Sequence, residues 1–403
     1  MIEKIKKIIE KRHFWRTVGF DELSELYISQ MLRSLSSSLV GLFVPIYLYK
    51  LGHSVMAICG MFVVWFLVRP LWSYVSARII GRFGPKHAIA LSVMAQIIYL
   101  SFVLTIQTVG WPLWIVGIIG SFCYSLYMMA FEVDFSKIKH STHGGKELSY
   151  MQMFERIGAI LGPVIGGLVA TFIDPRFTIG LAIVTLCGSL VPIFMSAETV
   201  RQNQLIIVKG FPWKRHRRDM YVGAAFALEN VVSVTVWPLF LGIFVLRENT
   251  YATLGILAAV STVTTFVAVF AIGKMIDNNK GLRLLSIGVV LNGILHFVRP
   301  LATLPVHALA INVADEPLTA MYRMPFLKGR YDAADSVPGY RIVYFMLLEL
   351  FIAAANILFW GLLTVIAMMI SDRAVFQAAF IIGGIMSFLI TQQRFAALKV
   401  TRS

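Results

Sequence analysis

Long apolar stretches recur along the whole chain, and they constrain its fold more than any other feature. A helix needs ~20 residues to cross a bilayer, and twelve stretches reach about that length with short polar breaks between them. The expected spans are 24–49, 56–79, 87–108, 112–136, 149–172, 177–197, 220–246, 250–276, 283–302, 305–328, 339–369 and 373–393. Hydrophobic residues make up 58% of the 403 residues, against 14% charged. The predicted fold class is therefore an all-α integral membrane protein with twelve transmembrane helices.

Basic side chains are concentrated in alternate connections between these spans. The richer set comprises Lys4, Lys6, Lys7, Lys11, Arg12, Arg16, Arg78, Arg82, Lys86, Lys137, Lys139, Lys146, Arg201, the cluster at 209–218, Lys280, Arg283, Lys328, Arg330, Arg341, Arg394, Lys399 and Arg402. The other set holds Lys50, Arg176, Arg247, Arg299 and Arg373. Because cytoplasmic connections carry the excess of Lys and Arg, we expect a multi-pass protein of the cell membrane with both termini in the cytoplasm. The net charge of +15 then reflects topology, and no nucleic-acid partner is predicted.

The remaining composition argues against several other classes of protein. Cys59, Cys123 and Cys187 all fall inside predicted spans without paired spacing, which indicates neither a disulfide framework nor a zinc site. The sequence has no metal-ligand cluster and no nucleotide-binding loop, so we expect no metal, no cofactor and no enzymatic activity. In residues 1–20, isoleucines on one helical face oppose lysines, a pattern typical of a helix at the cytoplasmic membrane surface.

Two halves of the chain follow one pattern. The matched segments are 44–48 with 237–241, 77–86 with 273–283, and Tyr150 and Glu155 with Tyr344 and Glu349. Their offsets are nearly constant, at about 193 to 196 residues, and a common offset indicates an internal repeat. We therefore expect an N-terminal half at 21–198, a basic linker at 199–219, a C-terminal half at 220–393, and cytoplasmic segments at 1–20 and 394–403.

Two short motifs give these halves a family resemblance. The first comprises Arg78, Gly81, Arg82, Gly84 and Lys86, repeated as Gly273, Asp277 and Arg283, and the second comprises Gly162, Pro163, Gly166 and Gly167 after Gly158. They look like motifs A and C of the major facilitator superfamily, and the chain resembles that family over its whole length. The resemblance implies two pseudo-symmetric six-helix bundles. Motif C is often associated with antiporters, although helix packing is its simpler explanation. The first-half motif departs from the family by having Gly81 where aspartate is usual.

Ionisable residues within predicted spans supply the candidate site, because a charge at the centre of a span costs at least ~2.5–3.5 kcal/mol. In the span 305–328, polar residues recur at three- and four-residue spacing and form one stripe. The candidates for substrate or proton binding are Arg33, Ser36, Ser37, Glu229, Asn230, Asn312, Asp315, Glu316, Thr319 and Arg323. The family resemblance implies that Arg33, Glu229 and Asp315 surround one central pocket. Three readings stay open: proton coupling through Glu229 or Asp315, a static ion pair with Arg33 or Arg323, and direct substrate contact.

A second set of charges lies nearer the cytoplasmic ends of the spans. It comprises the acids Glu132, Asp134, Glu155 and Glu349, with Arg78, Arg82, Arg156, Lys137 and Arg341 as possible partners. Salt bridges that form between the halves in only one conformation would make this set a gate. Charges that merely extend toward the membrane surface are the alternative reading.

These features predict a secondary transporter that moves a small organic solute across the cytoplasmic membrane by alternating access. We expect proton coupling, efflux rather than uptake, contact with membrane lipid, and a monomer. Two other functions fit the same scaffold: a lipid flippase or lipid-binding membrane protein, and a membrane partner that transports nothing.

Overall fold

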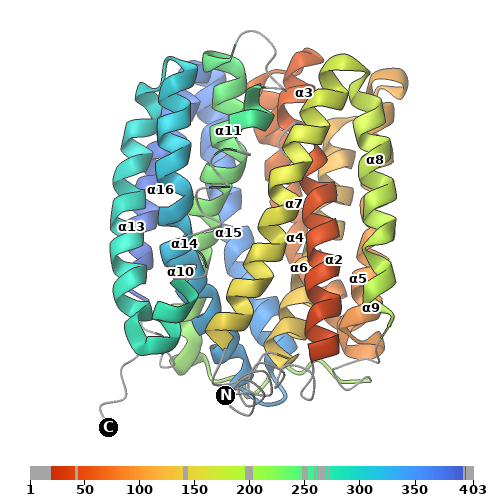
Figure 1. The fold of residues 1–403 in the computed structure, drawn as a ribbon, viewed down its shortest axis with the longest axis vertical. Helices are drawn as coiled ribbons and strands as arrows, with labels where there is room; N and C mark the ends of the chain where they lie inside the picture. Colours follow the sequence, from red (N-terminus) through yellow and green to blue (C-terminus); the bar gives the residue numbers. More distant parts are fainter. Residues whose placement is uncertain are drawn as a thin grey trace, which may run out of the picture.

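The computed structural model describes residues 20–40, 44–138, 144–195, 203–246, 253–257 and 272–393, with isolated positions at 260, 263, 269 and 395. Long helices stand side by side with their axes roughly parallel (Figure 1). In the first half they are α2 (Phe20–Val40), α3 (Val44–Lys50), α4 (Val55–Phe83), α5 (Pro85–Val109), α6 (Leu113–Ile138), α7 (Gly144–Phe172), α8 (Pro175–Gly188) and α9 (Leu190–Ile193).

The second half continues the same architecture. It contains α10 (Trp213–Val231), η2 (Val232–Val236), α11 (Trp237–Phe240), η3 (Leu241–Val245), η4 (Ile276–Lys280), α13 (Gly281–Val298), η5 (Arg299–Leu301), α14 (Pro305–Asp335), α15 (Arg341–Met369) and α16 (Asp372–Ile390). Within the described residues, ten helical segments are long and apolar enough to cross a membrane. Helix α14, with 31 residues, is also long enough to cross a membrane, but its polar stripe makes it less apolar than these ten segments. Most of the predicted span 250–276 lies outside the described residues, so the helices are consistent with twelve spans.

Equivalent helices in the two halves pack against equivalent neighbours. In the first half α2 packs on α7 and α8, and α5 packs on α6; in the second half α10 packs on α15 and α16, and α13 packs on α14. Helix α4 of the first half runs along α15 of the second. The predicted pseudo-symmetric, all-α membrane fold is confirmed by this arrangement.

The matched prolines lie in the later part of the first span of each half. Pro45 is the second residue of α3 and Pro238 is the second residue of α11. Proline lacks a backbone N–H, so each of these residues removes one possible helical hydrogen bond from its span. Before Pro238 the chain forms the π-helical turn η2, a distortion that is frequent at functional sites. This π-helical turn begins three residues after Glu229 of α10.

The glycines of the second motif allow two helices to approach closely. A Cβ atom on Gly158 would lie 2.4 Å from the carbonyl oxygen of Met31, and one on Gly166 would lie 2.6 Å from that of Leu39. A Cβ atom on Gly162 would lie 2.6 Å from Cβ of Ser38. These contacts are with α2, so the motif packs α7 against α2, which is the simpler of the two explanations.

The linker contacts the first motif directly. Gln204 donates its backbone N–H to the carbonyl oxygen of Gly81 at 2.7 Å, and Asn203 donates to that of Arg82 at 3.3 Å. A Cβ atom on Gly81 would lie 2.9 Å from the carbonyl oxygen of Gln204. Glycine at the family's aspartate position therefore makes room for the linker backbone.

The seventh span starts earlier than expected. Helix α10 begins at Trp213 rather than at residue 220, so the basic cluster Lys214–Arg218 forms its first turns.

The next glycine of the first motif, Gly84, joins α4 to α5 with a φ of 89°, a backbone conformation that favours glycine. We call the end of the molecule where α4 meets α5 and α10 begins the basic end.

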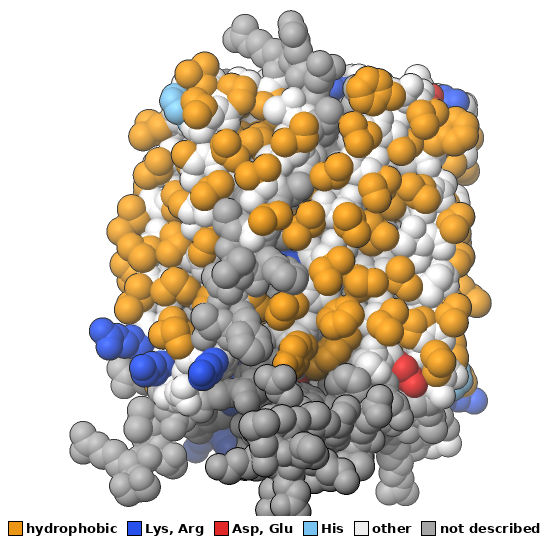
Figure 2. Space-filling model, viewed as in Figure 1, with side chains coloured by type: hydrophobic (Ala, Val, Ile, Leu, Met, Phe, Trp, Pro, Cys, Tyr) orange, Lys and Arg blue, Asp and Glu red, His pale blue; other side chains and the backbone are white. Residues whose placement is uncertain are grey.

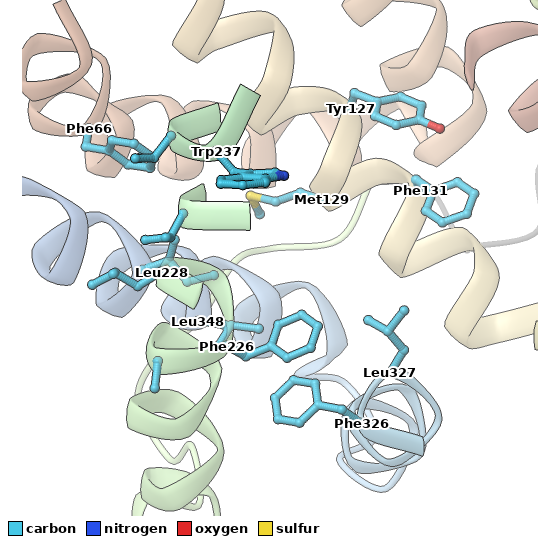
Figure 3. Close-up of a cluster of buried hydrophobic side chains, with 14 of the residues drawn as sticks. Phe66, Tyr127, Met129, Phe131, Phe226, Leu228, Trp237, Phe326, Leu327 and Leu348 are labelled. Atoms are coloured by element: carbon cyan, nitrogen blue, oxygen red, sulfur yellow. The ribbon is translucent and has the colours of Figure 1, made fainter. Parts of the chain in front are cut away.

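Apolar side chains cover the outside of the bundle and also join the halves inside it. Figure 2 shows hydrophobic side chains over most of the height of the molecule, as expected for a surface in contact with lipid. Inside, the buried cluster of Figure 3 includes Phe66 of α4, Met129 of α6 and Leu348 of α15. Near the end opposite the basic end, Gly242 of η3 faces Ile46 of α3, with 3.0 Å from a Cβ atom built on the glycine to Cδ1 of the isoleucine.

Candidate functional site

A buried carboxylate lies at the centre of a polar network in the second half. Glu229 of α10 is only 1% exposed. Its Oε1 accepts hydrogen bonds from Ser233 Oγ and Asn292 Nδ2, both at 2.9 Å, and its Oε2 accepts one from the Tyr322 hydroxyl at 2.6 Å. His296 Nε2 lies 3.1 Å from the same Oε1. This carboxylate is therefore saturated with donors from α13, α14 and its own span.

The network continues from His296 to the predicted candidate Asp315. Arg299 Nη1 lies 3.2 Å from His296 Nδ1, and Arg299 Nη2 lies 2.8 Å from Asp315 Oδ1. A guanidinium can only donate, so Nδ1 of the histidine accepts and its Nε2 carries the hydrogen that faces Glu229. One continuous chain of contacts thus links the two carboxylates that the sequence singled out.

Other candidates of the second half lie around this network in different ways. Asn312 accepts a hydrogen bond at 2.6 Å from the indole of Trp237, whose ring lies 5.4 Å from the guanidinium carbon of Arg299. Asn230 and Thr319 are half-buried. Glu316 points away from the network, toward Arg156 of α7.

The candidates of the first half are separate from it. Ser36 is fully buried and donates to the carbonyl oxygen of Ala182 in α8, whereas Ser37 is exposed. Arg33 stacks on Tyr127 of α6, with 3.3 Å from its guanidinium carbon to the ring centroid. The reading in which Arg33 or Arg323 pairs with a central carboxylate is not borne out for these partners, because His296 contacts Glu229 and Arg299 contacts Asp315.

Ion pairs join the two halves across their interface. Arg69 Nε of α4 lies 2.5 Å from Glu349 Oε2 of α15. The other pairs are Arg156 of α7 with Glu316 of α14, Arg330 of α14 with Glu132 of α6, and Arg323 of α14 with Glu155 of α7 at 4.0 Å. Each pair takes one member from each half, as the gate hypothesis requires.

The partners of the gate acids differ from those expected. Arg78 and Arg82 are exposed at the basic end, with their guanidinium groups over Tyr74 and Phe83. Arg341 pairs with Asp335 of its own half. Spacing along the sequence suggested nearby arginines, but long-range packing brings Arg69 and Arg330 to the acids instead.

The remaining motif residues occupy structural positions. Lys86 Nζ lies 3.8 Å from Glu25 of α2. Asp134, Pro163, Gly167 and Gly273 are buried, and Arg283 is exposed. The backbone of Asp277 lies in η4, and its side chain lies outside the described part of the structure.

Sequence reasoning missed most of the network on α13. It assigned Arg299 to an outer connection, yet this residue is 0% exposed. Asn292, His296 and Arg299 are separated by four and three residues and therefore share one helical face. These residues form a polar stripe like that of α14, and their spacing is the sequence signal that identifies them as part of the network.

An all-helical bundle of two equivalent halves, with charges buried at their interface, defines a polytopic membrane transporter. Residues 26–320 match the family model of the Major Facilitator Superfamily, so the chain belongs to that family, as the motifs predicted. The crystal structure of the human organic anion transporter MFSD10 (TETRAN) has a similar fold, with a TM-score of 0.66 at 12% identity over 92% of this chain and 99% of that chain. No curated protein matches the chain.

Proposed function

We propose that this protein is a proton-coupled secondary transporter that exports a small organic solute by alternating access. The observation that carries the proposal is the set of ion pairs between the halves, above all Arg69 with Glu349 and Arg330 with Glu132. Glu132 and Arg330 lie within two turns of the basic ends of α6 and α14. Such pairs stabilise the conformation closed at this end and must break when it opens, which gives the two states different contacts.

The network of Glu229, His296, Arg299 and Asp315 supports proton coupling. With His296 neutral, it contains two carboxylates and one guanidinium, so a single added proton balances its charge. Asp315 keeps 15% of its side chain exposed, whereas Glu229 is sealed. A proton entering at Asp315 and leaving when substrate binds would couple the two movements.

Orientation and direction follow from charge and motif. The excess of Lys and Arg supports a cytoplasmic location for the basic end and for both termini. The resemblance of the α7 glycine motif to one often found in antiporters supports export. The apolar outer surface supports lipid as the surrounding partner, and we expect the monomer to be the transporting unit.

The proposal is tested with purified protein in proteoliposomes containing a pH-sensitive dye. Solutes found by a thermal-shift screen are added, and the proton flux that each one induces is recorded. Glu229→Gln and Asp315→Asn should each reduce this flux, whereas Asp372→Asn, a neutralised carboxylate at the start of α16, should leave it unchanged. Wild-type proton movement in both central variants would refute the coupling. Movement of labelled phospholipid without solute flux would instead support the lipid-transport alternative.

A further inference from the structure

Arg33 is a buried cation that has no acidic partner. It is 7% exposed, and its closest aromatic contact is the ring of Tyr127, 3.3 Å from the guanidinium carbon. Within the described residues no carboxylate forms an ion pair with it, and its Nη1 has no hydrogen-bond partner. The positive charge is therefore left uncompensated inside the bundle.

The other buried arginines behave differently. Arg69, Arg156, Arg299 and Arg330 are each buried, and each lies against a carboxylate, three of them from the opposite half. An unpaired charge in a low-dielectric interior is strongly destabilising, whereas a paired one is tolerated. Packing alone gives no reason to keep Arg33 as arginine, so its free donor points to a ligand that supplies the missing negative charge.

The surroundings of Arg33 are aromatic and partly open. Tyr124 precedes Tyr127 by three residues on α6, so the two rings lie on the same helical face. Although Tyr124 lies midway along α6, 40% of its surface is exposed. Its ring is flanked by Trp65 at 6.3 Å and by the guanidinium carbon of Arg69 at 4.8 Å. Tyr124 therefore presents exposed aromatic surface about one helical turn from the ring that covers Arg33.

We propose that Arg33 binds the carboxylate of an organic anion, with the apolar body of that anion against Tyr124 and Tyr127. Tyr127 covers one face of the guanidinium, which leaves the N–H edge for a planar carboxylate. A neutral solute would leave the charge unbalanced, and a cationic one would add to it. This inference rests on the proposed transport function, since it names the class of substrate that the transporter carries.

The test is equilibrium binding to purified protein in detergent, without any membrane gradient. The probes are 2-naphthoate, phenylacetate and hexanoate, each compared with its own amide. The acids should raise the unfolding temperature of the wild type, and the amides should not. Arg33→Gln should weaken binding of the acids by about tenfold or more, the usual effect of losing a charge-assisted hydrogen bond, and Arg33→Lys should weaken it less. Equal stabilisation by acids and amides, or by neither, would overturn the proposal.

A structural role for Arg33 is separated from a binding role by stability without ligand. Arg33→Gln should keep at least the wild-type unfolding temperature, because it removes an unpaired buried charge. Arg69→Gln, the matched control, should lower that temperature by leaving Glu349 unpaired. An equal loss in both variants would show that Arg33 is structural, contrary to the proposal.

The binding assay also separates this inference from the proposed function. Binding of the acids without solute flux in proteoliposomes would support the anion site and contradict transport. Flux of an amide that is unaffected by Arg33→Gln would support transport and contradict the anion site.

Discussion

Arg69 of α4 and Glu349 of α15 form an ion pair of 2.5 Å between residues 280 positions apart in the sequence. Glu349 has an equivalent in the first half, Glu155, which lies 4.0 Å from Arg323 of the other half. Both repeat-related acids therefore reach across the interface to an arginine. The repeat thus reappears in the two acids, although their arginine partners lie on helices that are not equivalent, α4 and α14.

Removing one member of this pair should be costly. Arg69→Gln leaves the carboxylate of Glu349 buried without its partner, and we expect a loss of about 3–5 kcal/mol in the free energy of unfolding. Denaturant unfolding of the detergent-solubilised protein measures it. The double variant Arg69→Gln/Glu349→Gln should recover part of the loss, because neither charge is then left alone. A single variant as stable as the wild type would contradict the pairing.

Breaking the pair nearest the basic end should open that end. Ala334 is fully buried one turn beyond Arg330, so a cysteine introduced there reports opening through its reaction with a membrane-impermeant maleimide. In a background with Cys59, Cys123 and Cys187 replaced by alanine, Arg330→Gln should raise the labelling rate by about tenfold, which corresponds to ~1.4 kcal/mol of lost closed-state stability. Arg78→Gln, an exposed arginine at the same end, is the control and should have no effect.

Close packing of α7 on α2 should not tolerate a methyl group at Gly158. The added Cβ atom would lie 2.4 Å from the carbonyl oxygen of Met31, so the helices must separate. We expect Gly158→Ala to lower the free energy of unfolding by about 1–3 kcal/mol, as overpacking does. Gly180→Ala is the matched control on α8, where nothing lies within 4 Å of the new atom. Equal stability of the two variants would argue against the close contact.

Restoring the family's aspartate at Gly81 should release the linker. The new side chain would collide with the carbonyl oxygen of Gln204 and with Ile206, and it would weaken the backbone hydrogen bonds at Gly81 and Arg82. Limited proteolysis should then cleave Gly81→Asp faster than the wild type after Lys209, which is exposed in this linker. Gly81→Ala separates the steric effect from the charge. Unchanged cleavage of both variants would mean that the linker does not depend on this glycine.

Several features could be predicted because they depend on local sequence. Apolar length and hydropathy predicted the spans, and a constant offset predicted the repeat, since both are properties of neighbouring residues. The polar stripe of α14 was likewise visible as helical spacing, and it contains Asp315 and Glu316, which both form ion pairs. Asn292, His296 and Arg299 show the same spacing on α13 and the turn that follows it.

Apolar periodicity and the paired motifs were thus enough to establish a helical membrane protein of two related halves. The ion-pair partner of each buried charge could not be predicted from these local patterns. Glu132 joins Arg330 and Glu316 joins Arg156 over separations of 198 and 160 residues, and these choices depend on how the halves dock. Docking also left Arg33 as the one buried arginine in the described structure without an acid. A charge's partner is set by distances in space, which no local pattern of residues encodes.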